Sequence, residues 1–192
     1  MCGIVGIIAT ETRSIYPLIL NSLRQLQNRG YDSSGIGLLR NGCIDIHKFS
    51  STDEESSIDK LGSDPRLLRY PDNCVGIGHN RWATHGKKTD INAHPHFSQN
   101  KDFAIVHNGI IENYQQLKTK MLSYGYKFYS QTDTEVIASL LEYYYNEVND
   151  VFHAISHMIK DIEGTYGLII IHSNKPDSIY AVRNGSPLLI GM

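Results

Sequence analysis

Several features that would classify a protein quickly are scarce or missing in this chain of 192 residues. The chain has only three cysteines, Cys2, Cys43 and Cys74, and they are odd in number and widely spaced. Such a set fits neither a disulfide framework nor a closed zinc site, which needs four ligands at short spacing. We therefore expect free thiols and no bound metal.

The chain also lacks the patterns of membrane, secreted and nucleotide-binding proteins. No apolar run reaches the length of a bilayer span, and the first residues do not form a signal peptide, so we expect a cytosolic protein without a membrane partner. The formal net charge is -2 with both signs interspersed, which argues against a nucleic-acid partner. No GxGxxG, GxxxxGKS or GxxxxGKT sequence is present, so we expect no phosphate-binding loop and no cofactor.

The chain does contain a regular succession of strand and helix patterns. Alternating apolar residues predict strands at 3–9, 32–40, 43–49, 74–82, 102–108, 165–173 and 178–183. Apolar residues at helical spacing predict helices at 14–28, 112–124, 134–145 and 151–162. The strands come in adjacent pairs and the helices in runs, which favours an α+β fold with largely antiparallel sheets.

Two segments have weaker patterns. Residues 50–72 are polar, and we expect a mobile segment there with a short helix at 58–68. The chain ends in SPLLIGM (186–192), which resembles the start of another strand. We therefore expect the sequence to be part of something longer.

Cys2 comes directly after the initiator methionine and directly before a predicted strand. A free thiol with a pKa of about 8.5 is only a few per cent thiolate at neutral pH, so a cysteine nucleophile needs a neighbouring base. If Met1 is removed, the new α-amino group of Cys2, with a reference pKa of roughly 7.7 to 8.0, could be that base. The alternative is that Cys2 is a small apolar residue filling the end of the strand.

A second cluster, GHNRWATHG (78–86), places Arg81 and Trp82 at the end of a predicted strand, on an exposed turn. The guanidinium group can bind a carboxylate through two parallel hydrogen bonds, and the indole can cover it. The alternative is a surface arginine beside a core tryptophan. A metal site is a further alternative, disfavoured by the proline of HPH and by the lack of nearby cysteine or carboxylate ligands, and it would use His79, His85, His94 and His96.

A third cluster, HNGIIENY (107–114), lies between a predicted strand and a predicted helix. We expect Asn108 and Gly109 on a tight turn, where a side-chain amide and a backbone N–H can converge on one oxygen. That is the geometry of an oxyanion hole, which stabilises negative charge in a transition state. A plain Asn-Gly turn is the alternative.

A fourth cluster, QTDTEV (131–136), precedes an apolar helical run. Thr132 and Glu135 have the spacing of a capping box, and a helix start accounts for both of them. Asp133 adds a second acid in the first turn, where the helix dipole favours a carboxylate that can accept hydrogen bonds from a substrate ammonium.

Together these motifs resemble one family closely. MCGIVG, QNRGYDSSG, GHNRWATHG, NAHPH, HNGIIENY, TDTEVI, EGTYG and GSPLLIG occur in the order and approximate spacing of class II glutamine amidotransferases. The resemblance covers almost the whole chain except 47–72, and it is closest to the glutaminase half of the members that aminate fructose 6-phosphate. It implies a four-layer αββα sandwich of the N-terminal nucleophile hydrolase type, with antiparallel sheets between helical layers.

The resemblance also implies an activity, the hydrolysis of L-glutamine to glutamate and ammonia. Cys2 would attack the side-chain amide with its freed α-amine as base, and Asn108 and Gly109 would form the oxyanion hole. Arg81 would bind the α-carboxylate of glutamine, and Asp133 its α-ammonium.

The resemblance implies roles for five further residues. Thr84 and His85 would line the glutamine pocket, Arg29 and Gly30 would close the site beside the nucleophile, and Trp82 would control the passage of ammonia.

The resemblance finally implies a domain organisation. Residues 1–192 would form a glutaminase domain that lacks its last strands and the sugar-isomerase module, through which the full-length enzyme, a homo-oligomer, would bind fructose 6-phosphate. One alternative is the glutaminase domain of another class II amidotransferase, notably one acting on phosphoribosyl pyrophosphate. Another is a binding module that keeps the fold without turnover.

Overall fold

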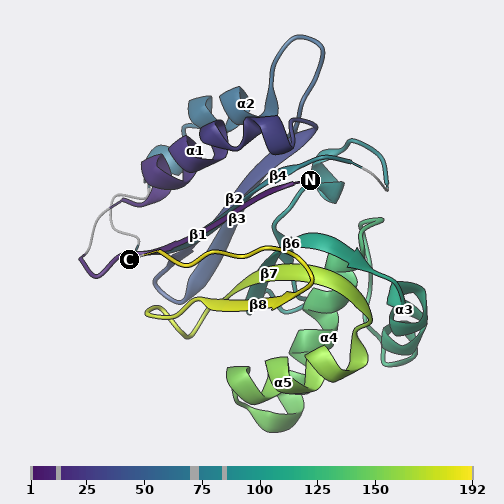
Figure 1. The fold of residues 1–192 in the computed structure, drawn as a ribbon. Coiled ribbons are helices and arrows are strands. Elements are labelled where there is room, and N and C mark those ends of the chain that lie inside the picture. The colour runs from purple at the N-terminus through teal and green to yellow at the C-terminus, as the bar shows by residue number, and fades with distance from the viewer. Residues whose placement is uncertain (1, 12–13, 70–73, 84–85, 192) are drawn as a thin grey trace.

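The computed structural model describes residues 2–11, 14–69, 74–83 and 86–191, and they form four layers (Figure 1). Two sheets lie face to face, and helices cover the outer face of each (Figure 1). The strand order is β1-β4-β2-β3 in the first sheet and β5-β6-β7-β8 in the second, and neighbouring strands in both are antiparallel. The predicted α+β fold with an αββα arrangement is confirmed.

The first sheet pins the N-terminal residues. Its strands are β1 (Gly3–Ile8), β2 (Ser33–Arg40), β3 (Cys43–Ser50) and β4 (Val75–Arg81). The predicted hairpin between β2 and β3 turns at Asn41 and Gly42, which both have positive φ, as a two-residue hairpin turn requires. In the pairing of β1 with β4, Gly3 lies opposite Asn80, so Cys2 lies beside the end of β4.

The second sheet consists of β5 (His96–Phe97), β6 (Phe103–Ile111), β7 (Gly164–His172) and β8 (Tyr180–Asn184). The expected turn at Asn108 and Gly109 is wrong, because β6 continues through both residues, which pair with Gly167 and Tyr166 of β7. Gly109 has a φ of 135, and a Cβ there would lie 2.0 Å from the Thr165 carbonyl oxygen. The glycine therefore permits a close approach of two strands rather than a reversal of the chain.

Helices of different length cover the two sheets. On the first sheet lie α1 (Tyr16–Gln25), the 3-10 turn η1 (Gln27–Arg29), α2 (Ser57–Ser63) and a second turn, η2 (Leu67–Arg69). On the second lie α3 (Tyr114–Ser123), α4 (Asp133–Val148) and α5 (Val151–Asp161). A further short turn, η3 (Asp90–Asn92), precedes β5. Each long helix starts within two residues of its predicted start. α1, α3 and α5 end one to three residues before their predicted ends, whereas α4 ends three residues after its predicted end.

The segment 50–72 is more ordered in its packing than its polar sequence suggested. Ser56 caps α2 by accepting a hydrogen bond from the Asp59 N–H. Ile58, Leu61 and Leu67 are buried against α1 and β2. These three side chains therefore belong to the core of the first helical layer.

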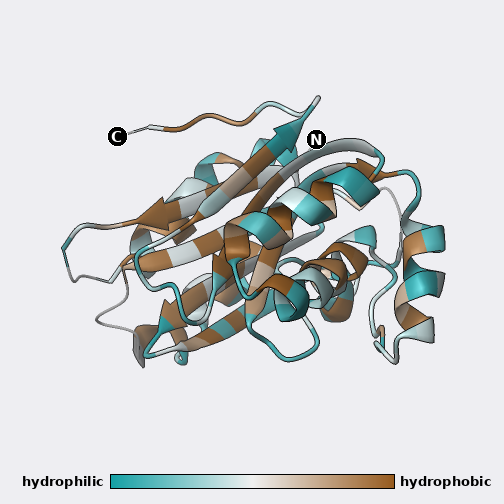
Figure 2. Cartoon of the chain, turned by 90° about the horizontal axis from the view of Figure 1, so that it is seen from below, coloured by the Kyte–Doolittle hydropathy of each residue, from teal (hydrophilic) through white to brown (hydrophobic). Residues whose placement is uncertain are grey.

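Three apolar layers result from this stacking. One lies between the first helices and the first sheet, one between the sheets, and one between the second sheet and α3, α4 and α5. Figure 2 shows hydrophobic residues running along the strands and on the adjacent sides of the helices. The middle layer contains eight buried residues, Leu39, Ile44, Val75, Ile77, Ala104, Val106, Ile169 and Ile171.

Two local predictions fail at the ends of elements. Thr132 is the N-cap residue of α4, but its side chain makes no capping hydrogen bond, and Glu135 accepts from the N–H groups of Tyr129 and Ser130 instead, so no capping box forms. Residues 187–191 form no strand either. They run back alongside β1 after a single bridge between Tyr166 and Gly185 (Figure 1).

Within the described ranges, no helix combines the length and the apolar character needed to cross a membrane.

Candidate active site

A pocket opens where the start of β1 and the end of β4 in the first sheet meet β6 and the start of α4. Of the residues predicted for the site, five line this pocket: Cys2, Arg81, Trp82, Gly109 and Asp133. The other lining residues are His79, His94, His107, Ile110, Tyr114, Gln131 and Thr132. Segments that are far apart in the sequence thus form one site.

Cys2 lies at the mouth of this pocket, beside the chain that leaves β4. The Trp82 N–H donates to Cys2 Sγ over 3.2 Å, and the thiol faces the Trp82 carbonyl at 3.7 Å. Burial raises the pKa of the Cys2 thiol and outweighs the Trp82 hydrogen bond and the Arg81 charge, which lower it. The thiol is therefore protonated at neutral pH, and any role as a nucleophile requires a base.

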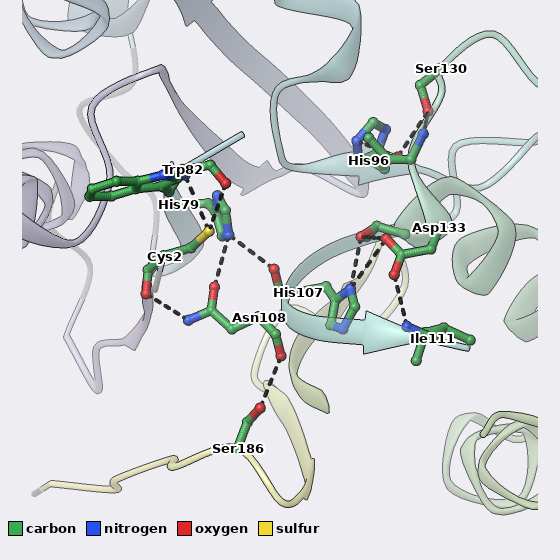
Figure 3. A network of polar contacts seen from close by, with 12 residues as sticks. Cys2, His79, Trp82, His96, His107, Asn108, Ile111, Ser130, Asp133 and Ser186 are labelled. Carbon is green, nitrogen blue, oxygen red and sulfur yellow. Dashed lines mark hydrogen bonds and ion pairs between the residues drawn. The ribbon is translucent and has the colours of Figure 1, made fainter. Parts of the chain in front are cut away.

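Asn108 extends from β6 across the gap between the sheets. Its Nδ2 donates to the Cys2 carbonyl oxygen over 2.9 Å, and its Oδ1 lies 3.0 Å from His79 Nε2 (Figure 3). The amide therefore lies next to Cys2, although it is in a strand rather than on a turn. At the back of the strand, Ser186 Oγ donates to the Asn108 carbonyl oxygen over 3.3 Å.

Arg81 is the last residue of β4 and is only 6% exposed, which corrects the expectation of an exposed turn. Burial lowers its pKa, but arginine stays protonated in proteins, so the pocket contains a buried cation. One guanidinium nitrogen donates to the Lys87 carbonyl oxygen over 3.3 Å. Trp82, in contrast, is 43% exposed and packs edge-to-face on Tyr31.

Asp133 is the first residue of α4 and supplies the pocket with an anion. Its Oδ2 accepts from the Ile111 N–H over 3.0 Å, and its Oδ1 lies 3.7 Å from His107 Nδ1 (Figure 3). Burial raises the pKa of Asp133, but the contacts with His107, Ile111 and Thr134 outweigh it and hold the pKa below its ordinary value. One fixed cation and one fixed anion therefore line the same pocket.

Three histidines pack together beneath the pocket. The rings of His79 and His94 stack at 4.2 Å, and His96 meets His94 edge-on at 4.8 Å. Burial lowers the pKa of His79 to about 3 and also lowers the pKa values of His94 and His96, so these rings are neutral. In the part of the chain that the structure describes, no group of three His, Cys, Asp or Glu side chains could hold a metal ion.

Gly30 and Arg29 follow α1 and lie on the other side of Cys2. A Cβ on Gly30 would lie 2.7 Å from the Arg81 carbonyl carbon and 2.9 Å from the Trp82 nitrogen, so only a glycine lets this turn pack on β4. Arg29 is exposed and lines a second pocket, which Cys2 and Asn108 share with β1 and the Ser186 segment. Thr84 and His85 lie outside the described residues.

Two histidines of the pocket were not predicted from the sequence to act in catalysis or substrate binding. His79 was predicted only as an alternative metal ligand, and His107 had no predicted role of its own. The available signal was strand spacing, because His79 is two residues before Arg81 on β4 and therefore lies on the same face. His107 directly precedes Asn108, and its Nδ1 lies 3.0 Å from Thr134 Oγ1 at the start of α4.

The chain is similar in sequence to known proteins. Residues 79–191 match the family model of the glutamine amidotransferase domain. The glutamine--fructose-6-phosphate aminotransferase (isomerizing) of Caldanaerobacter subterraneus subsp. tengcongensis is 45% identical over 194 residues, which cover 100% of this chain and 30% of that protein. The protein of the same name from Pseudomonas aeruginosa is 44% identical over 197 residues, with the same coverage.

The fold has solved counterparts. Glutamine phosphoribosylpyrophosphate (PRPP) amidotransferase from B. subtilis, complexed with ADP and GMP, superposes with a TM-score of 0.72 at 25% identity, covering 90% of this chain and 35% of that one. The chain spans about 30% of the length of the curated relatives it matches. The family model covers more than half of the chain, and these relatives match all of it, so the chain belongs to the glutamine amidotransferase domain family.

Proposed function

We propose that the chain hydrolyses L-glutamine to glutamate and ammonia with Cys2 as the nucleophile, once Met1 has been removed. The observation that supports this most directly is the position of Cys2, whose sulfur accepts from the Trp82 N–H and whose carbonyl accepts from the Asn108 amide. The nucleophile is thus fixed from both sheets at the edge of a pocket that contains one cation and one anion.

The chemistry begins with attack of Cys2 Sγ on the carbonyl carbon of the glutamine side-chain amide. The thiol proton passes to the freed α-amine, a base with a suitable reference pKa of about 8. The Asn108 NH₂ group and the Gly109 N–H stabilise the negative oxygen of the tetrahedral intermediate. The carbon–nitrogen bond then breaks, the α-ammonium returns its proton to the leaving nitrogen, and ammonia departs from a thioester.

The second half reaction hydrolyses this thioester. Water attacks the same carbon and its proton goes to the α-amine. The carbon–sulfur bond then breaks, and the α-ammonium returns this proton to the leaving sulfur, which gives glutamate and the free thiol. The same oxyanion hole serves both steps because both pass through a tetrahedral intermediate on the same carbon.

Recognition of the substrate rests on the two fixed charges. Arg81 binds the α-carboxylate through its planar donors, and Asp133 binds the α-ammonium. Gly30 and Arg29 close the site beside the nucleophile, and Trp82 controls where the ammonia leaves. The exposure of Trp82 and the contact of Gly30 with the β4 backbone are consistent with these roles.

We propose that the residues 1–192 act as the glutaminase domain of an enzyme that aminates fructose 6-phosphate, and that this enzyme is a homo-oligomer. The support is that curated relatives with this activity in their names are 42–45% identical across the chain, against 25% for the phosphoribosylpyrophosphate enzyme.

The experiment combines processing, turnover and labelling. Intact mass first establishes that Met1 has been lost; the processed protein is then expected to release glutamate from glutamine and to be alkylated at Cys2 by an electrophilic glutamine analogue. Cys43→Ser and Cys74→Ser are matched controls that should leave labelling unchanged. A processed, folded sample that neither releases glutamate nor is labelled would favour a binding module without turnover.

A further inference from the structure

The amide of Asn108 has two possible orientations that differ by half a turn, and only one of them presents its NH₂ group to Cys2. The buried contacts around His79 determine which orientation is adopted. His79 Nε2 lies 3.0 Å from the His107 carbonyl oxygen and 3.0 Å from Asn108 Oδ1. A backbone carbonyl can only accept a hydrogen bond, so Nε2 must be the protonated nitrogen of the ring.

A protonated Nε2 fixes the atom that faces it. The Asn108 side chain must offer its acceptor Oδ1 to the ring, which leaves Nδ2 on the side of Cys2, 2.9 Å from the Cys2 carbonyl oxygen. The reverse orientation would place the Asn108 NH₂ group against the His79 Nε2–H, and the Asn108 amide oxygen against the Cys2 carbonyl oxygen. Both contacts would leave partly buried polar groups without a hydrogen-bond partner, which disfavours the reverse orientation.

The His79 ring is itself held in place. It is 1% exposed, and His94 stacks on it with an interplanar angle of 14°. The segment that carries His94 is fixed in turn by Lys48, whose Nζ donates to the carbonyl oxygens of Ala93 over 2.7 Å and Pro95 over 3.1 Å. Burial holds the pKa of His79 at about 3, so the ring stays neutral in the physiological range.

We propose that His79 is a positioning residue for the oxyanion hole: its Nε2–H, shared between the His107 carbonyl and Asn108 Oδ1, holds the Asn108 amide with its NH₂ group toward the reacting carbon. This inference rests on the proposed glutaminase function. His79 does not touch the substrate in this role, since it acts through Asn108 and across the gap between the two sheets (Figure 3).

A kinetic double-mutant cycle tests the proposal. His79→Phe keeps a ring of similar size but removes the donor, and it is expected to lower kcat about 10- to 100-fold with KM changed less than about threefold. His79→Gln, which can place an N–H near the same position, should recover part of kcat. In an Asn108→Ala background, His79→Phe should cost less than about threefold, because the group it positions is gone.

The control for general damage is His172→Phe. His172 is a fully buried histidine at the opposite end of the second sheet, paired with Phe103, and its replacement should leave kcat unchanged. Thermal unfolding of every variant separates misfolding from loss of positioning. An equal fold loss from His79→Phe in both backgrounds, or a rise in KM at constant kcat, would overturn the proposal.

A second measurement does not depend on glutaminase activity. Nitrogen NMR of histidine-labelled wild-type protein should find His79 as the neutral ring protonated at Nε2 down to a pH of about 4. A His79 ring protonated only at Nδ1 overturns the inference whether or not glutamine is hydrolysed. If the ring is protonated at Nε2 but no glutamate is released, the proposed function fails while the geometric part of the inference stands.

Discussion

The layer between the two sheets has two halves with opposite character. At one end, β4 and β6 contribute Val75, Ile77, Ala104 and Val106, all part of the middle apolar cluster. Further along the same faces, at the same two-residue spacing, β4 contributes His79 and Arg81 and β6 contributes Asn108. The same pair of strands therefore contributes to the core at one end and forms the site at the other.

Burial does not distinguish the two halves. Ile77 is 0% exposed and His79 is 1% exposed, although they are neighbours on one strand face. The difference lies in hydrogen bonding, because two buried ring nitrogens at the polar end, His79 Nδ1 and His94 Nδ1, have no hydrogen-bond partner. Unpaired buried polar atoms destabilise a fold, so the apolar half must supply the stability that the polar half gives up.

The largest effect is expected at Cys2, the proposed nucleophile. Cys2→Ala should lower glutamate release at least about 1000-fold, because no other group in the pocket can form the thioester. The midpoint of thermal unfolding should change little, since the Cys2 side chain is only partly buried. Glutaminase assays and a melting curve on the same sample check this, and turnover above about a tenth of wild type would remove Cys2 from the mechanism.

The next largest effect is expected at Asn108, in the proposed oxyanion hole. Asn108→Ala should lower kcat about 100- to 1000-fold while KM changes little, because the amide acts on charge that develops in the transition state. Steady-state kinetics on glutamine measure the split. If KM rose instead while kcat stayed constant, Asn108 would be a substrate-binding residue. Another group of the polar half would then have to stabilise the transition state.

A smaller effect is expected at Arg81. Arg81→Ala should raise KM about 10- to 100-fold with a lesser change in kcat, because it removes a charged hydrogen-bonding fork from the bound carboxylate. Arg81→Lys keeps the charge without the planar fork, so its KM should lie between those of the wild type and Arg81→Ala. Equal kinetics for the lysine and alanine variants would mean that geometry alone, not charge, matters at this position.

The smallest effect is expected in the apolar half. Ile77→Val removes one methylene from a fully buried side chain and should lower the free energy of unfolding by about 0.5–1.5 kcal/mol. Values of kcat and KM should stay at wild type, although His79 is two residues away. Denaturant unfolding and kinetics measured together test this, and a kinetic change without loss of stability would show that the two halves are not independent.

Much of the fold followed from periodicity, because most strands and helices here carry regular apolar patterns. The hairpin at Asn41-Gly42 was predictable from its dipeptide alone. The two-residue strand β5 was missed because it is too short to show alternation. The end of β6 was misplaced because Asn-Gly is a turn signal, whereas here pairing with β7 determines the conformation of Gly109.

The candidate site was predictable residue by residue but not as an arrangement. Cys2, Arg81, Asn108 and Asp133 each stood in a motif, and the resemblance to a family gave them roles. The contact between His79 and Asn108 crosses from one sheet to the other, so no local pattern could reveal it. The catalytic roles and the cytosolic location remain predictions.

The hydrogen bond between the Asn108 amide and the Cys2 carbonyl also has a consequence for folding. It joins residues 106 positions apart, so it forms only when both sheets have been completed and packed on each other. Contacts that close such long loops are among the slower events in folding. We therefore expect glutaminase activity to return as one late phase in refolding experiments, after most of the helical signal, and no shorter piece that lacks either sheet to show it.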